Sequence, residues 1–148
     1  MHADAEAVRQ VHGTSIRQVC AADYSARQIE AWASPARIEQ YQFAIARHEF
    51  HVAVSNAAVI GFSELDRERG EVKAVYVAPG WLRRGVGRAL LAELERAARE
   101  VRLSELQLEA SLTAEPFYLA AGYHGVQRAA HILSSGEGLP CVQMRKVL

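Results

Sequence analysis

Residues 79–91, PGWLRRGVGRALL, combine the residue types of an anion-binding loop. Gly85 and Gly87 lack a Cβ, so a phosphate can approach the main chain closely. The apolar run after them has helical spacing, and the first backbone N–H groups of a helix have no intrahelical partner and carry partial positive charge. Three arginines that can add charge-assisted contacts flank the glycines, namely Arg83, Arg84 and Arg88. The stretch predicts a phosphate cradle at the entrance to a helix.

A simpler interpretation of the same stretch is also open. In this interpretation, the two glycines only permit a tight turn and close packing, and the three arginines only form a solvated face. Two other phosphate motifs are excluded here. A dinucleotide fingerprint needs a third glycine where Leu90 stands, and a Walker loop needs Gly-Lys-Ser/Thr.

A second motif follows about thirty residues later. The first, YVAPGWLRRGVGRALL, resembles the pyrophosphate-binding motif Q/R-x-x-G-x-G/A of the GCN5-related N-acetyltransferase (GNAT) superfamily, with Leu82 at the Q/R position as a departure. The second, SLTAEPFYLAAGY, resembles the late segment of that family; the residues in step are Ser111, Ala114, Tyr118, Gly122 and Tyr123. Together with YSARQIEAWA near the N-terminus, these segments resemble the YafP-type branch of bacterial acetyltransferases.

The resemblance implies an α/β (α+β) GNAT fold and acetyl-CoA as co-substrate, with no metal. The pyrophosphate would lie on the amides of residues 83–88, which include Val86, and Ser111 would also belong to the cofactor site. The pantetheine arm would pair like an added strand along Val75 to Val77. A backbone N–H at about Val77 would stabilise the oxyanion, with a β-bulge expected there.

Acyl transfer to an amine also needs a proton donor and a proton acceptor. Tyr118 matches the family's tyrosine and is the expected donor to the thiolate, although packing beside Phe117 is the alternative. Glu71 lies where some family members carry a catalytic glutamate, and Glu64 or a water relay are alternatives. Strand alternation would put Lys73 on the face of Glu71 and Val75, which would suit an acceptor that bears a carboxylate.

Other residues that could do chemistry fit no site. His48 and His51 are one residue too close for the zinc-protease HExxH pattern, so we expect a helix end and a strand there. His12, His124 and His131 have no spaced partners and are interpreted as surface or core groups. The two cysteines, Cys20 and Cys141, are expected to be free thiols.

Hydrophobic spacing and turn residues predict the elements that position these side chains. Helices are expected in the first third, where Ser25 can cap one helix and Pro35 can be the first residue of another. The later elements are, in order, strands 50–56 and 57–66 joined by a turn at Ser55-Asn56, strand 71–77, helix 85–101, strand 105–111, helix 113–122, and strands 127–135 and 140–148. They predict one domain, 1–148, with a central mixed, mostly antiparallel sheet covered by helices on both faces.

One element of the family is missing from this pattern. Relatives begin with a β-strand before the first helix, whereas this chain begins inside the expected helix. Strand 50–56 would then be left with an open edge, which predicts either a homodimer through that edge or a native start upstream of Met1.

The composition excludes several partners and compartments. Seventeen Lys and Arg balance seventeen Asp and Glu, so no overall field favours nucleic acid or an anionic membrane. No apolar run is long enough for a membrane span and no signal peptide is evident, so a cytoplasmic protein is expected. The prediction is an acetyl-CoA-dependent N-acetyltransferase with a small-molecule or peptide amine as acceptor. The alternatives are a non-catalytic acyl-CoA sensor and a nucleotide-phosphate-binding module.

Overall fold

A six-stranded sheet forms the centre of the protein in a computed structural model, which describes residues 2–34 and 37–148. The strand order is β1-β2-β3-β4-β6-β5, and every neighbouring pair is antiparallel except β3 and β4. The strands are β1 (Glu49–Ser55), β2 (Ala58–Asp66), β3 (Glu71–Val77), β4 (Glu105–Ser111), β5 (His124–Ile132) and β6 (Gly138–Val147). This mixed, mostly antiparallel sheet confirms the predicted architecture.

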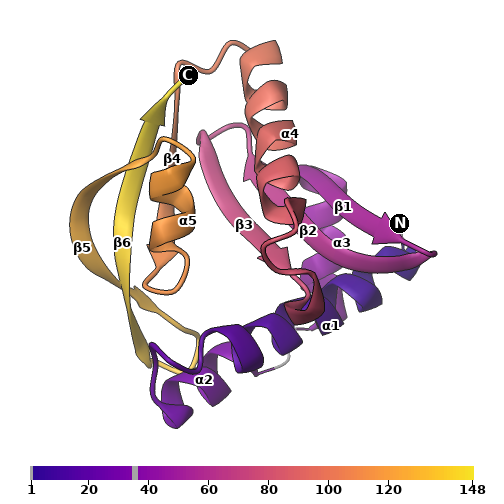
Figure 1. Cartoon of the computed structure of the whole chain (residues 1–148), viewed down its shortest axis with the longest axis vertical. Coiled ribbons are helices and arrows are strands. Elements are labelled where there is room, and N and C mark those ends of the chain that lie inside the picture. Colours follow the sequence, from indigo (N-terminus) through magenta and orange to yellow (C-terminus); the bar gives the residue numbers. More distant parts are fainter. Residues whose placement is uncertain (1, 35–36) are drawn as a thin grey trace.

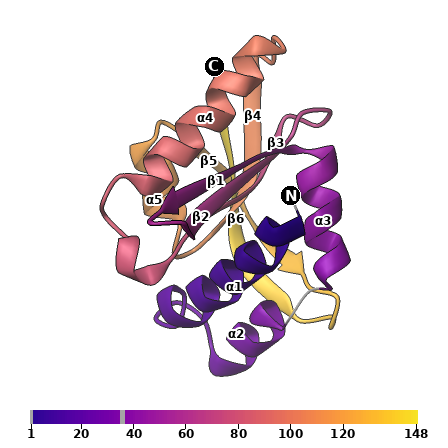
Figure 2. The ribbon, with the colours of Figure 1, turned by 90° about the vertical axis from the view of Figure 1, so that its right-hand side faces the viewer.

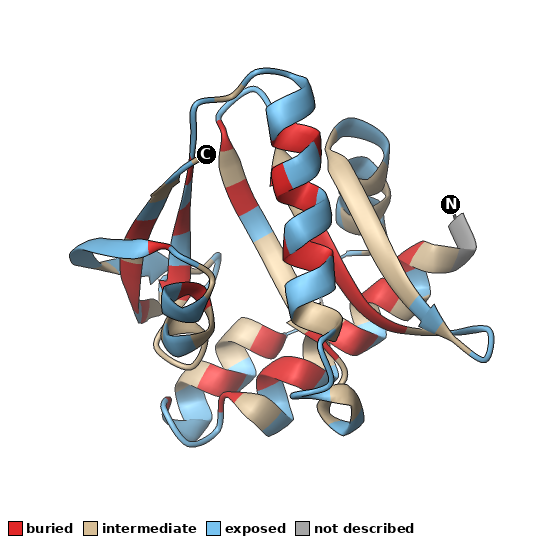
Figure 3. Ribbon diagram, turned by 45° about the horizontal axis from the view of Figure 1, so that its top comes forward, coloured by how far each residue is buried: buried red, intermediate tan, exposed pale blue. Residues whose placement is uncertain are grey.

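Helices cover both faces of the sheet. They are α1 (His2–Val19), α2 (Ala26–Ala33), α3 (Ile38–Arg47), α4 (Val86–Glu100) and α5 (Glu115–Ala120). α3 and α4 lie on opposite sides of β1 and β2 (Figure 2). α4 turns one buried stripe to the sheet (Figure 3), and its buried Leu91 and Leu94 share a core with Leu65 of β2 and Val72 of β3. A second core joins α1 to Phe62 of β2 on the other face.

The start of α2 follows the expected capping chemistry. The Ser25 Oγ accepts the Gln28 N–H at 3.1 Å, and the Gln28 side chain accepts the Ser25 N–H at 2.9 Å. This reciprocal pair is a capping box. The predicted helix start at Pro35 lies outside the described residues, and α3 is helical from Ile38.

The β1–β2 hairpin turns one residue later than predicted. Ser55 is the last residue of β1, and Asn56 and Ala57 form the turn with positive φ values of 49° and 65°. A turn with two left-handed residues matches the twist of the flanking strands. β1 pairs with β2 and forms one border of the sheet, which confirms the predicted open edge.

An irregularity in β3 changes the predicted faces of this strand. Glu64 pairs with Ala74 and Leu65 with Val72, so Lys73 is the extra residue of a bulge. Val72 and Val75 therefore face the same core beneath α4, and the prediction that Val75 shares a face with Glu71 and Lys73 was wrong. The bulge expected at Val77 was also misplaced, because Val77 pairs with Gly61 in regular register.

The sheet divides between its two parallel strands. Among the described residues, β3 and β4 share one paired position, Glu71 with Gln107, near the start of both strands. Beyond it the two strands run apart toward the end where α1 and α2 lie (Figure 1). Over most of its length, the side of β3 that faces β4 is thus not paired with any other described strand.

Candidate active site

The loop before α4 has the backbone geometry that its glycines predict. A short 3₁₀ turn, η1 (Pro79–Trp81), is followed by Arg83 and Gly85 with left-handed φ values of 60° and 85°. The first bond of α4 runs from the Ala89 N–H to the Gly85 carbonyl at 3.0 Å. The N–H groups of residues 86–88 precede that bond and have no i−4 carbonyl. With the positive end of the helix dipole, they form an anion-binding geometry.

The two glycines are needed for different reasons. A Cβ at Gly85 would meet no atom within 4 Å, so that position requires glycine for its φ and leaves open space over the backbone. A Cβ at Gly87 would lie 3.2 Å from Cε1 of Phe117 and 3.5 Å from Cγ2 of Val77. Both interpretations of the loop therefore apply, at positions two residues apart: Gly85 leaves the backbone bare, and Gly87 permits close packing.

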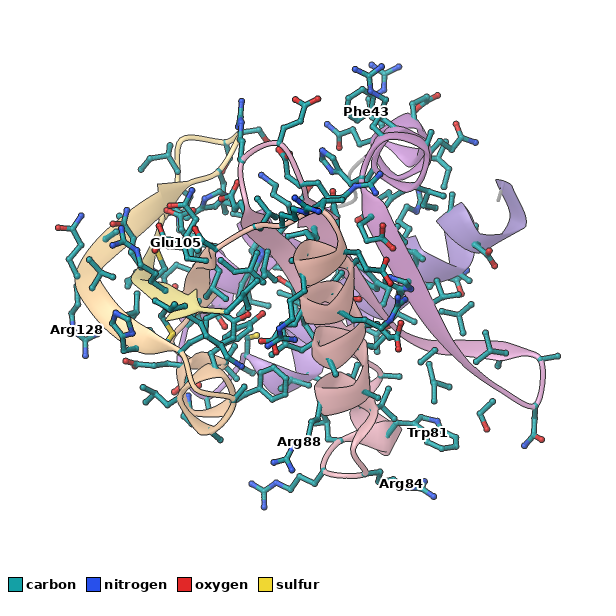
Figure 4. The ribbon with its side chains drawn as sticks, turned by 90° about the horizontal axis from the view of Figure 1, so that it is seen from above. Phe43, Trp81, Arg84, Arg88, Glu105 and Arg128 are labelled. Carbon is teal, nitrogen blue, oxygen red and sulfur yellow. The ribbon has the colours of Figure 1, made fainter. Side chains whose placement is uncertain are left out.

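The arginines of the loop are exposed. The Arg84 guanidinium lies 4.4 Å from the centre of the Trp81 ring, and among the described residues Arg83, Arg84 and Arg88 form no ion pair. Figure 4 shows Arg84 and Arg88 at the start of α4, directed away from the body of the protein. Their charges are available to a ligand at this end of the helix.

Tyr118 is held rigidly on α5 with its phenol protonated. It is 5% exposed, its ring packs edge-on against Phe117 and Tyr123, and its N–H donates to the Ala114 carbonyl at 3.2 Å. Burial raises the pKa of the Tyr118 hydroxyl well above its usual value. The hydroxyl makes no hydrogen bond with any described residue, so its proton is available to a partner.

A cleft of about 350 Å³ opens where β3 and β4 separate. Its walls come from strands β1 to β6 and from α1, α2 and α3, and Tyr118 reaches it from α5. Of the residues predicted for the site, this cleft brings together Glu64, Glu71, Lys73, Val75, Ser111 and Tyr118. The arginines and glycines of the loop are not among its lining residues.

Three carboxylates line the cleft, and each has a basic neighbour. The pairs are Glu71 Oε1 with Lys73 Nζ at 3.5 Å, Glu64 Oε2 with His48 Nδ1 at 2.5 Å, and Glu109 Oε1 with His131 Nδ1 at 3.1 Å. Glu64 and Glu71 are both less than one-third exposed. His48 caps α3 and His51 lies on β1, as predicted, and among the described residues no three His, Cys, Asp or Glu side chains are grouped to hold a metal ion.

The remaining predicted residues act through other contacts. The Ser111 Oγ accepts the Ala114 N–H at 3.1 Å and so holds the turn into α5. Val77 is buried under the loop, and its carbonyl accepts the Ser15 hydroxyl at 3.3 Å. The Val86 side chain packs towards Gly61 of β2, which leaves only its backbone for a ligand.

His12 lines the cleft, although no local sequence pattern marks it as a cleft residue. Its Nδ1 lies 2.9 Å from the Tyr41 hydroxyl, and its ring centre lies 4.5 Å from that of Tyr76. Burial lowers the pKa of His12 to about 4, so the ring is neutral at pH 7. His12 and Tyr41 are distant in sequence and meet only because α1 packs on α3, which no local pattern encodes.

Tyr24 also lines the cleft, and sequence analysis did not assign it to the site. Its hydroxyl donates to the Pro140 carbonyl at 2.6 Å and accepts the Leu112 N–H at 2.9 Å. The segment between α1 and α2 is thereby joined to β6 and to the end of β4. The two buried cysteines, Cys20 and Cys141, are free thiols as predicted.

Comparison with known proteins identifies this arrangement. Residues 20–148 match the family described as "Acetyltransferase (GNAT) domain". The chain belongs to this family. The match confirms the resemblance inferred from the two glycine-containing motifs.

Among the described helices, none has the length and apolar character needed to span a membrane.

Individual GNAT proteins resemble the chain over different lengths. It is 34% identical over 105 residues to "Uncharacterized N-acetyltransferase YafP" of Escherichia coli K12, a match that spans 71% of this chain and 65% of that relative. A GCN5-related N-acetyltransferase from Rhodopseudomonas palustris superposes with a TM-score of 0.93 at 31% identity, covering 99% of this chain and 91% of the other. The PaiA N-acetyltransferase of Thermoplasma acidophilum, solved in complex with coenzyme A, shares the fold, with a TM-score of 0.78 at 20% identity over 99% and 94% of the two chains.

Proposed function

We propose that the chain is an acetyl-CoA-dependent N-acetyltransferase that passes the acetyl group directly to a primary amine. The observation that carries this proposal is the separation of β3 from β4. It leads from the bare N-terminus of α4 to a cleft that also exposes Tyr118 and three carboxylates. A cofactor and an acceptor can meet there from opposite sides of the sheet, within one domain formed by residues 1–148.

Residues of the loop and of β3 fit a CoA thioester. The amides of residues 83–88 and the exposed guanidinium groups of Arg83, Arg84 and Arg88 suit the pyrophosphate. Val75 to Val77 lie where β4 has moved away from β3, so the β4 side of this segment, apart from the Val77 carbonyl that accepts the Ser15 hydroxyl, is open to the amides of the pantetheine arm. Ser111, at the end of β4, faces the same space.

Bound acetyl-CoA supplies an acetyl group activated as a thioester. As the amine nitrogen bonds to the carbonyl carbon and the C–S bond breaks, the Val77 N–H would stabilise the negative charge on the carbonyl oxygen. Tyr118 would donate its proton to the leaving sulfur, because burial keeps the hydroxyl protonated. Glu71 or Glu64, directly or through water, would take the proton that the acceptor ammonium loses.

Two substitutions separate the candidate bases. Glu71→Gln is expected to lower kcat/KM at neutral pH by about 10²-fold or more and to recover partly at high pH, where the amine loses its proton unaided. Glu64→Gln should change kcat/KM only a few-fold, because Glu64 Oε2 lies 2.5 Å from His48 Nδ1 and is held more closely than Glu71 Oε1, which lies 3.5 Å from Lys73 Nζ. The reverse order of effects in pH–rate profiles would assign the base to Glu64, and no effect of either would assign it to water.

Turnover tests the proposed function. Release of CoA thiol is measured from acetyl-CoA with a panel of primary amines, and CoA binding is followed separately by thermal shift. Binding without acetyl transfer to any amine would favour a sensor, and a larger shift with ATP than with CoA would favour a nucleotide-binding module.

A further inference from the structure

The cleft contains a continuous aromatic surface that acetyl transfer itself does not require. Phe50, Phe62 and Tyr76 lie on adjacent strands, and their rings stack with centres 5.6 Å apart at 3° and 5.5 Å apart at 26°. Tyr41 of α3 stands beside them, and all four rings line the cleft. Phe62 is fully buried and supports the two half-buried rings on either side. We call these four residues the aromatic surface.

His12 extends this surface without adding charge. Its ring lies 4.5 Å from Tyr76 and 5.8 Å from Phe62, centre to centre. Burial lowers its pKa to about 4, so it is a flat neutral ring at pH 7. The Tyr41 hydroxyl holds the ring in place through Nδ1.

The charges of the cleft are mostly negative and lie at one end. Glu64, Glu71 and Glu109 stand on β2, β3 and β4 near the position where β3 and β4 still pair. Lys73 is the one lysine or arginine among the described lining residues, and it is already paired with Glu71. A ligand carboxylate would have to displace Glu71 from Lys73, whereas a ligand cation can approach Glu64 and Glu109, whose basic neighbours are histidines rather than lysine or arginine.

We propose that the acceptor is a small primary amine whose ammonium group is carried on an apolar, ring-sized body. The inference rests on the proposed function and specifies its substrate class. The body packs on the aromatic surface, where offset and edge-on ring contacts are favourable. The ammonium faces the three carboxylates beside the separation of β3 and β4. A volume of about 350 Å³ is near the lower end for ligand pockets, which suits a small molecule better than a protein segment.

Three matched amines test this inference. 2-Phenylethylamine has both features, propylamine lacks the ring, and phenylalanine adds a carboxylate. With acetyl-CoA saturating, kcat/KM for 2-phenylethylamine is expected to exceed each of the others by about tenfold or more. Transfer that is equal or faster with propylamine or phenylalanine overturns the inference and leaves the proposed function intact.

Two pairs of variants locate the selectivity. Tyr41→Ala should narrow the preference for 2-phenylethylamine over propylamine. Phe43→Ala on the same helix should not, because Phe43 does not line the cleft, is 57% exposed and points outward from the protein (Figure 4). Glu109→Gln should narrow the preference over phenylalanine, whereas Glu105→Gln on the same strand should not, because Glu105 does not line the cleft. Equal effects of a variant and its control contradict the assignment.

A binding measurement keeps the two proposals separable. Saturation-transfer NMR of the ring protons of 2-phenylethylamine, with CoA present, reports contact with the cleft without turnover. If the protein acetylates none of the amines, the proposed function is overturned. Absence of saturation transfer to the ring, or saturation that is unchanged in Tyr41→Ala, overturns the inference about the cleft.

Discussion

Tyr118 is the residue whose chemistry and packing can be separated most cleanly. Phenylalanine keeps the ring that contacts Phe117 and Tyr123 and removes only the hydroxyl. Tyr118→Phe is expected to lower kcat by about 10²–10⁴-fold, the range for loss of a general acid, with CoA affinity and Tm nearly unchanged. Steady-state kinetics and a melting curve check this. A kcat within a few-fold of the original, with a lower Tm, would make Tyr118 a packing residue.

The protonation of His12, a cleft residue, is expected to make the free energy of unfolding depend on pH. Its pKa is about 4 in the folded chain and about 6.5 when exposed, so between these values the unfolded state binds more protons. The contribution of His12 is therefore present above pH 6.5 and is lost as the pH falls to 4, by up to about 3 kcal/mol. Urea unfolding from pH 7.5 to 4.5 should show a steeper loss for the original chain than for His12→Asn. Identical pH slopes would show that His12 is not buried in its neutral form.

At the scale of elements, local signals were sufficient where one segment determines its own shape. The Ser25 capping box and the left-handed Gly85 before α4 follow from neighbouring residues. The bulge at Lys73 does not, because it depends on how β3 registers with β2. The contacts of Tyr24 and the His12–Tyr41 pair likewise join segments far apart in sequence. The backbone geometry of the loop could thus be predicted, but the shape of the cleft between β3 and β4 could not.

Gly87 could be required for packing against Phe117 or for close approach of the pyrophosphate to the backbone, and two substitutions separate these roles. Gly87→Ala adds a Cβ at 3.2 Å from Phe117 Cε1, so it should lower both Tm and CoA affinity. Phe117→Leu in that background relieves the contact and should restore much of the Tm. CoA affinity should stay low if the pyrophosphate needs the bare backbone at residue 87. Calorimetry measures the affinity of the double variant for CoA. If CoA affinity recovers together with Tm, Gly87 is needed for packing alone.

At the scale of the whole molecule, the sheet ends in two strands with unpaired sides, β1 and β5. Open edges are templates for pairing with another chain, and proteins commonly protect them with lysine. Val54 on β1 is 57% exposed and Ile132 on β5 is 65% exposed, so each edge carries an apolar side chain in solvent. The two edge strands differ in how far neighbouring elements cover them. β1 is half-buried along most of its length between α3 and α4, whereas β5 is exposed at nearly every residue.

A strand supported on both faces presents an ordered edge, so we expect the chain to dimerise through β1. Light scattering after size exclusion should then give a dimer mass for the original chain and for Ile132→Lys. Val54→Lys places a charge on the paired edge and should shift the mass towards the monomer, with an unchanged Tm at low protein concentration. A monomer in all three proteins would show that the β1 edge is solvated. Dissociation by Ile132→Lys alone would move the interface to β5, on the far side of the cleft from α3.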